Sequence, residues 1–124
     1  MAASDQDLIA LVEALDAADD PERGRLGREL DDNGARDAAP RMAAAPDALT
    51  RRAGARIMHL LPDESYLPAL VPLVDDPDES VADAAWRALR GQLRTDEWRA
   101  AVTRIATDGP PHRREDAARW LSER

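Results

Sequence analysis

The chain has 124 residues, of which 44 % are hydrophobic, so it is long enough to fold as one domain. Its net charge of −8 argues against nucleic-acid binding, which needs a basic surface to replace counterions. It has no Cys, which excludes disulfides, thiolate metal sites and Cys nucleophiles. No basic start or apolar run of a signal peptide or membrane span occurs, so we expect a cytoplasmic protein that binds no membrane.

The apolar residues are mostly Ala and Leu, with no Phe and little β-branched enrichment. Ala is the strongest helix former, and strands have weak support, so the composition predicts an all-α fold. Apolar residues recur at helical spacing through nearly the whole chain. In chain order we expect eight helices, in four antiparallel pairs, over residues 5–17, 21–32, 35–45, 46–61, 64–74, 77–93, 96–107 and 111–122.

Capping signals set the first helix boundaries. Ser4 followed by Asp7 predicts a capping box at the first helix. Asp20 before Pro21 predicts the cap and first position of the second, and the Asn33–Gly34 pair predicts its end.

Later boundaries carry similar signals. Pro46 and Asp47 open the fourth helix, which we expect to turn Leu49 inward. For the sixth helix we predict Asp76 as the cap, with Pro77 first and Glu79 in a capping-box position, and for the seventh we predict Thr95 as the cap.

A self-match at a spacing of about 32 residues runs through the chain. Tyr66 reappears as Trp98, and Ala53, Ala85 and Ala117 form one column. Pro40 and Pro72, each inside a predicted helix, stand at the same spacing. A period in this range indicates stacked helical units, which usually build binding surfaces. We expect a single domain over residues 1–124, with units at about 4–33, 35–61, 63–93 and 95–123.

The segment over residues 67–89 resembles a HEAT repeat. This family has a first helix kinked by Pro, an Asp-Pro turn and a second helix with small and aliphatic residues at fixed offsets. Those places are filled here by Pro72, Asp76, Val81, Ala85 and Leu89. The fourth unit keeps the family's Asp–Arg ladder pair as Asp108 and Arg114, and the first unit is out of register. The resemblance implies an α-α superhelix, a short solenoid with its second helices on the concave side, that serves as a scaffold for another protein.

Chemistry-bearing residues are sparse. His59 and His112 have no second ligand at metal spacing, and the acidic pairs lie at helix boundaries where capping explains them, so we expect no metal, no cofactor and no catalytic residue. His59 is either a general base on the concave face or a partly exposed helix residue, and we favour the latter.

The candidate binding surface consists of Arg residues that flank the inward stripes of the second helices. With Trp86 as an apolar anchor, the set comprises Arg52, Arg56, Arg87, Arg90 and Arg119. Such a strip would attract anionic groups on an otherwise acidic protein. The alternative is that these Arg residues pair with acidic neighbours such as Asp83 and Glu115, and that Trp86 packs against the next unit.

The sequence therefore favours a non-enzymatic adaptor that binds another protein on the concave face. One alternative is an enzyme or accessory of the bilin-lyase-like class, which would need a deep apolar cavity beside His59. Another is self-association through solenoid ends, if Ile9 and Trp120 are exposed. We expect a monomer or a weak homodimer.

Overall fold

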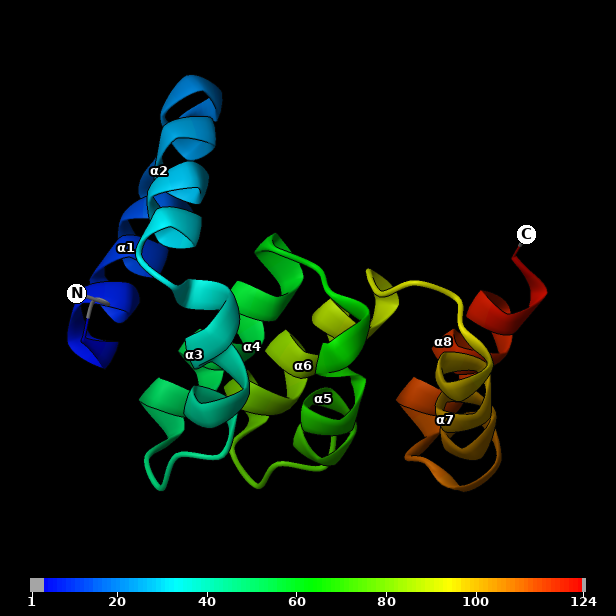
Figure 1. The fold of residues 1–124 in the computed structure, drawn as a ribbon. Coiled ribbons are helices and arrows are strands. Elements are labelled where there is room, and N and C mark those ends of the chain that lie inside the picture. Colours follow the sequence, from blue (N-terminus) through cyan, green and yellow to red (C-terminus); the bar gives the residue numbers. More distant parts are fainter. Residues whose placement is uncertain (1–3, 124) are drawn as a thin grey trace.

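The computed structural model describes residues 4–123, which form eight α-helices, one short 3₁₀ turn and no strand (Figure 1). The all-α prediction and the number of helices are confirmed. The elements are α1 (Asp5–Ala17), α2 (Asp20–Asp32), α3 (Ala35–Ala43), α4 (Ala48–Leu60), η1 (Glu64–Tyr66), α5 (Leu67–Leu73), α6 (Glu79–Arg90), α7 (Asp96–Asp108) and α8 (Pro111–Ser122).

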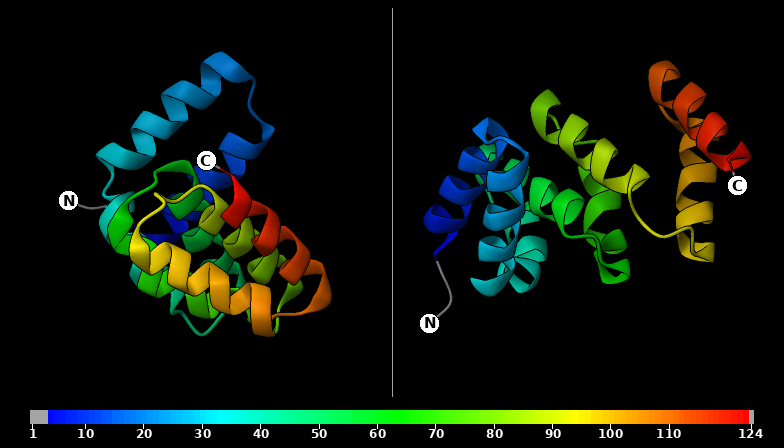
Figure 2. Two further views of the ribbon diagram at one scale, coloured as in Figure 1. Left: turned by 90° about the vertical axis from the view of Figure 1, so that its right-hand side faces the viewer. Right: turned by 90° about the horizontal axis from the view of Figure 1, so that it is seen from above.

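The helices from α3 onward stack as antiparallel pairs in two layers. Helices α3, α5 and α7 form one layer, and α4, α6 and α8 form the second-helix layer behind it (Figures 1 and 2). Helix α4 packs on both α3 and α6, so the pair α3–α4 buries apolar surface against the pair α5–α6. The predicted α-solenoid is therefore confirmed.

The first hairpin departs from this stacking. Helix α1 packs on its hairpin partner α2 and, within the stacked body, chiefly on α4, while α2 also contacts α3 and projects from the body (Figure 1). Among its residues only Leu26 and Leu30 are buried, which is too little apolar surface to dock a whole helix face. This arrangement fits a first unit that is out of register with the repeat.

Several predicted caps are confirmed. The Ser4 and Asp7 side chains form a reciprocal capping box. The Thr95 hydroxyl accepts from the backbone N–H of Trp98 at 3.1 Å. The fourth helix was expected to begin at Pro46, but α4 begins at Ala48, and the Asp47 carboxylate caps it. The α2–α3 turn depends on Gly34, whose φ of 81° favours glycine.

Two cap predictions are wrong by one or two residues. Helix α2 is capped by Asp19 rather than Asp20. Helix α6 is capped by Asp78 rather than Asp76, so Pro77 and Glu79 do not have their predicted roles. The Asp76 carboxylate is instead held in two hydrogen bonds by the guanidinium of Arg51 on α4, at 2.8 and 3.2 Å.

That Arg51–Asp76 contact joins two successive units through an Asp and an Arg. The pair expected from the family resemblance, Asp108 with Arg114, forms no ion pair among residues 4–123. Leu49 was expected to face inward, but 52 % of its surface is exposed, because it lies in the first turn of α4 and faces an open hollow between α1 and α4.

Tryptophan side chains join the third helix pair to the fourth. The Trp98 indole N–H donates to the carbonyl of Leu89 at 2.8 Å. The Trp86 and Trp120 rings stack with centroids 4.2 Å apart, and the buried guanidinium of Arg113 lies 3.1 Å from the Asp83 carboxylate. Specific aromatic and polar contacts therefore supply much of this junction.

Candidate functional site: an arginine-lined groove

A hollow of about 400 Å³ opens on the second-helix layer between α4 and α6, beside the N-terminal half of α2. We call it the arginine groove. It is lined by Arg23, Arg52, Arg56, His59, Leu60, Ser80, Asp83, Ala84 and Arg87.

Helical spacing places the groove's side chains. Arg52, Arg56 and His59 follow one another at intervals of four and three residues, which puts them on one face of α4. The buried face of the same helix carries Ala53 and Ile57. Helix α6 contributes Arg87 from the opposite wall. Arg87 is exposed because it lies on the side of α6 that faces away from the buried residues of that helix.

The groove has more positive than negative charge. Among the side chains of residues 4–63 and 65–123, no acidic group lies within ion-pair distance of Arg23, Arg52 or Arg87. The one acidic group in the lining, Asp83, is paired with Arg113. Three unpaired guanidinium groups therefore face one hollow of a protein whose net charge is −8, and they create a local anion-attracting surface.

A fourth guanidinium is already engaged. Arg56 is only 25 % exposed and forms an ion pair with Asp16 of α1. Its Nε is buried without a hydrogen-bond partner, so this arginine retains unused donor capacity.

The structure brings three of the predicted site residues together: Arg52, Arg56 and Arg87 all line the groove. Arg90 and Arg119 do not line it. Arg90 lies at the far end of α6, 3.8 Å from Glu123, and Arg119 pairs with Asp116 one turn earlier in α8.

Trp86 is only 7 % exposed, stacks on Trp120 and donates its indole N–H to Asp116 at 3.3 Å. These contacts correspond to the alternative in which Trp86 packs against the next unit. Sequence reasoning missed Arg23, because α2 lies outside the repeat and no spacing connects it to α4 or α6.

The hydroxyl and imidazole groups that line the groove are not joined as a nucleophile and its base. The Ser80 hydroxyl donates to its neighbour Asp78 at 2.6 Å, and within the described chain no hydrogen bond connects it to His59. Leaving aside Glu64, whose side chain the structure does not describe, no group of three His, Asp or Glu side chains in residues 4–123 could hold a metal ion. The same part of the chain contains no helix with the length and apolar character needed to cross a membrane.

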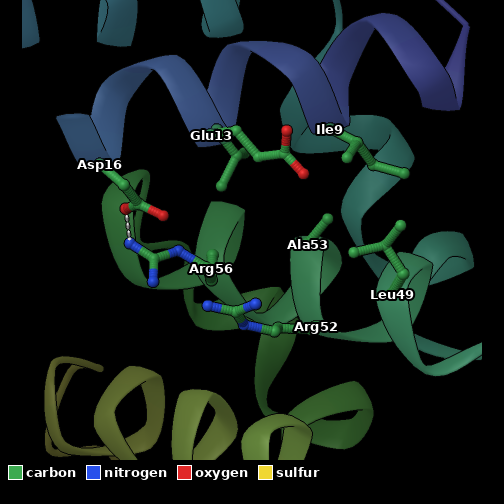
Figure 3. Close-up of a pocket in the computed structure, with 8 residues that line it drawn as sticks. Ile9, Glu13, Asp16, Leu49, Arg52, Ala53 and Arg56 are labelled. Carbon is green, nitrogen blue, oxygen red and sulfur yellow. Dashed lines mark hydrogen bonds and ion pairs between the residues drawn. The ribbon is translucent and has the colours of Figure 1, made fainter. Parts of the chain in front are cut away.

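A second hollow, of about 170 Å³, lies between α1 and α4 (Figure 3). Arg52 and Arg56 border both hollows. The apolar wall of this second hollow consists of Ile9, Val12, Leu49 and Ala53, and Glu13 and Asp16 of α1 complete its lining. We call it the apolar pocket.

Comparison with known proteins gives one match. A family model described as HEAT repeats matches residues 35–122, from the start of α3 to the end of α8. No curated protein and no solved structure matches the chain.

Proposed function

This chain belongs to the HEAT-repeat family, whose members commonly serve as protein-interaction scaffolds, and from that premise we propose that it is a non-enzymatic adaptor. It binds an acidic segment of another protein in the arginine groove. The observation that carries this proposal is the set of three unpaired guanidinium groups, from Arg23, Arg52 and Arg87, that face one hollow.

An acidic protein segment suits the groove better than a nucleic acid does. The arginine groove is one local basic patch, and the surrounding protein carries the net charge of −8. A polyanion longer than the groove would meet repulsion on both sides of it, whereas a short acidic segment would not. Guanidinium groups also bind carboxylates in a planar, two-bond geometry that favours Asp and Glu side chains.

Affinity capture followed by mass spectrometry tests the proposal. The test variant combines Arg23→Glu, Arg52→Glu and Arg87→Glu, and it should lose the protein that the wild type captures from its own cells. Circular dichroism should show unchanged helicity, because Arg23, Arg52 and Arg87 are all exposed.

A matched control keeps the same change of charge outside the groove, in Arg28→Glu, Arg99→Glu and Arg114→Glu, which are also exposed. This control should retain the captured protein. If both triple variants capture it equally well, the groove is not the binding surface.

We also propose that the protein is a cytoplasmic monomer formed by a single domain of four units. Ile9 and Trp120, the two side chains that could have supported end-to-end association, are only 5 % and 3 % exposed. Light scattering of the purified protein should give the monomer mass, and cell fractionation should place the protein in the cytoplasm.

A further inference from the structure

The two hollows adjoin along α4 and differ in chemistry. The apolar pocket lies on the α1 side of α4, and the arginine groove lies on the α6 side, with Arg52 and Arg56 between them. Building on the proposed function, we propose that the bound segment carries two determinants. An apolar side chain enters the apolar pocket, and an acidic side chain about three positions away enters the arginine groove.

The apolar pocket can hold one aliphatic or aromatic side chain. Its volume of about 170 Å³ is close to that of apolar cavities that accept benzene, roughly 150 Å³. Leu49, on its wall, is 52 % exposed, and within residues 4–123 only Leu93 is a comparably exposed large hydrophobic residue. An apolar ligand side chain would cover Leu49 and remove that surface from water.

Charge determines which end of the segment enters which hollow. Of the two acidic side chains of α1 in the lining, Asp16 is neutralised by its ion pair with Arg56, whereas Glu13 has no ion-pair partner among the described side chains (Figure 3). Glu13 therefore repels a carboxylate placed in the apolar pocket. The unpaired Arg23 and Arg87 are absent from the lining of that pocket and face the groove instead. The acidic residue of the segment is therefore directed toward α6 and the apolar residue toward α1.

The spacing follows from helix packing. Helices in contact lie about 8–10 Å apart, so crossing α4 from one hollow to the other takes about one such distance. An extended chain advances about 3.3 Å per residue. The apolar and acidic residues are therefore about three positions apart, with two residues between them that cross α4 near Arg52.

Fluorescence anisotropy with synthetic peptides tests this motif. The parent peptide is a fluorescein-labelled Gly/Ser chain with one Leu, two spacer residues and three consecutive Glu. Three variants replace the Leu by Ser, replace the Glu residues by Gln, or lengthen the spacer by four residues. The proteins are the wild type, Leu49→Ser, Arg87→Gln and, as the matched control, Leu93→Ser.

We expect Leu49→Ser to weaken binding of the parent peptide about tenfold, and Leu93→Ser to leave it unchanged. The peptide without Leu should bind the wild type about tenfold more weakly than the parent peptide does. Its affinity should not fall further when the protein is Leu49→Ser. Such non-additivity shows that the two Leu side chains contact each other. The Gln peptide should show the same non-additivity with Arg87→Gln, and the longer spacer should remove the benefit of Leu.

Three results would overturn the inference. One is equal binding of the peptides with and without Leu; if Arg87→Gln still weakens both, the proposed binding of acidic segments survives. The second is displacement of the peptide by an equal concentration of oligo-uridine RNA, which would indicate a nucleic-acid site. The third is no binding of any peptide, after which the capture experiment with groove variants decides the proposed function independently.

Discussion

Helices α3 and α4 approach each other closely at Gly54 of α4. A Cβ atom added there would lie 2.8 Å from the backbone nitrogen of Ala43 and 2.9 Å from the carbonyl oxygen of Ala39, both on α3. Neither atom belongs to a side chain that could rotate away. Gly54→Ala therefore forces α3 away from α4 by about 0.6 Å before the contact reaches an ordinary 3.4 Å.

The cost of that movement exceeds the gain in helix propensity. Gly→Ala inside a helix is favourable by about 0.8–1 kcal/mol. Overpacking typically costs about 1–3 kcal/mol, and a gap of about 0.5–1 Å removes about a quarter to a half of the attractive energy of each dispersion contact. Because Ala39, Met42 and Ala43 of α3 are all buried, we expect the upper end of that range and a net loss of about 2 kcal/mol.

Urea and thermal unfolding followed by circular dichroism measure this change. For a chain of this size, a loss of about 2 kcal/mol lowers Tm by roughly 5–10 °C. The matched control is Gly27→Ala in the middle of α2, where an added Cβ has nothing within 4 Å. It should stabilise the protein by up to about 1 kcal/mol. A Gly54→Ala protein that is as stable as the wild type, or more stable, would show that α3 and α4 tolerate the added methyl group at this contact.

Two further substitutions test the junctions between units. Burial raises the pKa of Asp76, but hydrogen bonds from Arg51 and from the Asp78 amide outweigh it and hold the pKa below the usual 3.8. A lowered pKa adds stability that is present above pH 3.8 and is lost as pH falls below it. Asp76→Asn should therefore lower the free energy of unfolding by about 1–2 kcal/mol at pH 7, and the difference from wild type should shrink below pH 3.8. A difference in stability that is constant with pH would contradict this ionic account. Trp98→Phe removes the indole N–H donor from the buried carbonyl of Leu89 and should cost about 1–3 kcal/mol in urea unfolding, whereas an unchanged midpoint would show that this bond contributes nothing.

Most of the fold could be predicted because its signals are local. Ser4, Asp47 and Thr95 each cap a helix, because the side-chain oxygen accepts a hydrogen bond from the backbone N–H three residues later. Such bonds depend only on neighbouring residues. The Asp76 prediction was wrong for the opposite reason, since Arg51 is 25 residues away in sequence and competes for that carboxylate.

The candidate site was only partly predictable. Arg52, Arg56 and Arg87 could be placed on one surface, because the repeat fixes which face each second helix turns outward. No periodicity could place Arg23, because α2 lies outside the repeat. Arg119 has the same repeat position as Arg87, yet it pairs with Asp116 and does not line the groove.

Sequence alone determined the all-α class, the helix count and the stacked units, because propensity, capping and apolar periodicity act within a helix or between neighbours. Only the tertiary structure decided that α1 packs on α4 and that Arg23 and Arg87 line the same groove. It also decided that Leu49 stays exposed on the wall of a pocket. These features depend on how the first hairpin docks, and docking depends on long-range packing and charge pairing that no local pattern records.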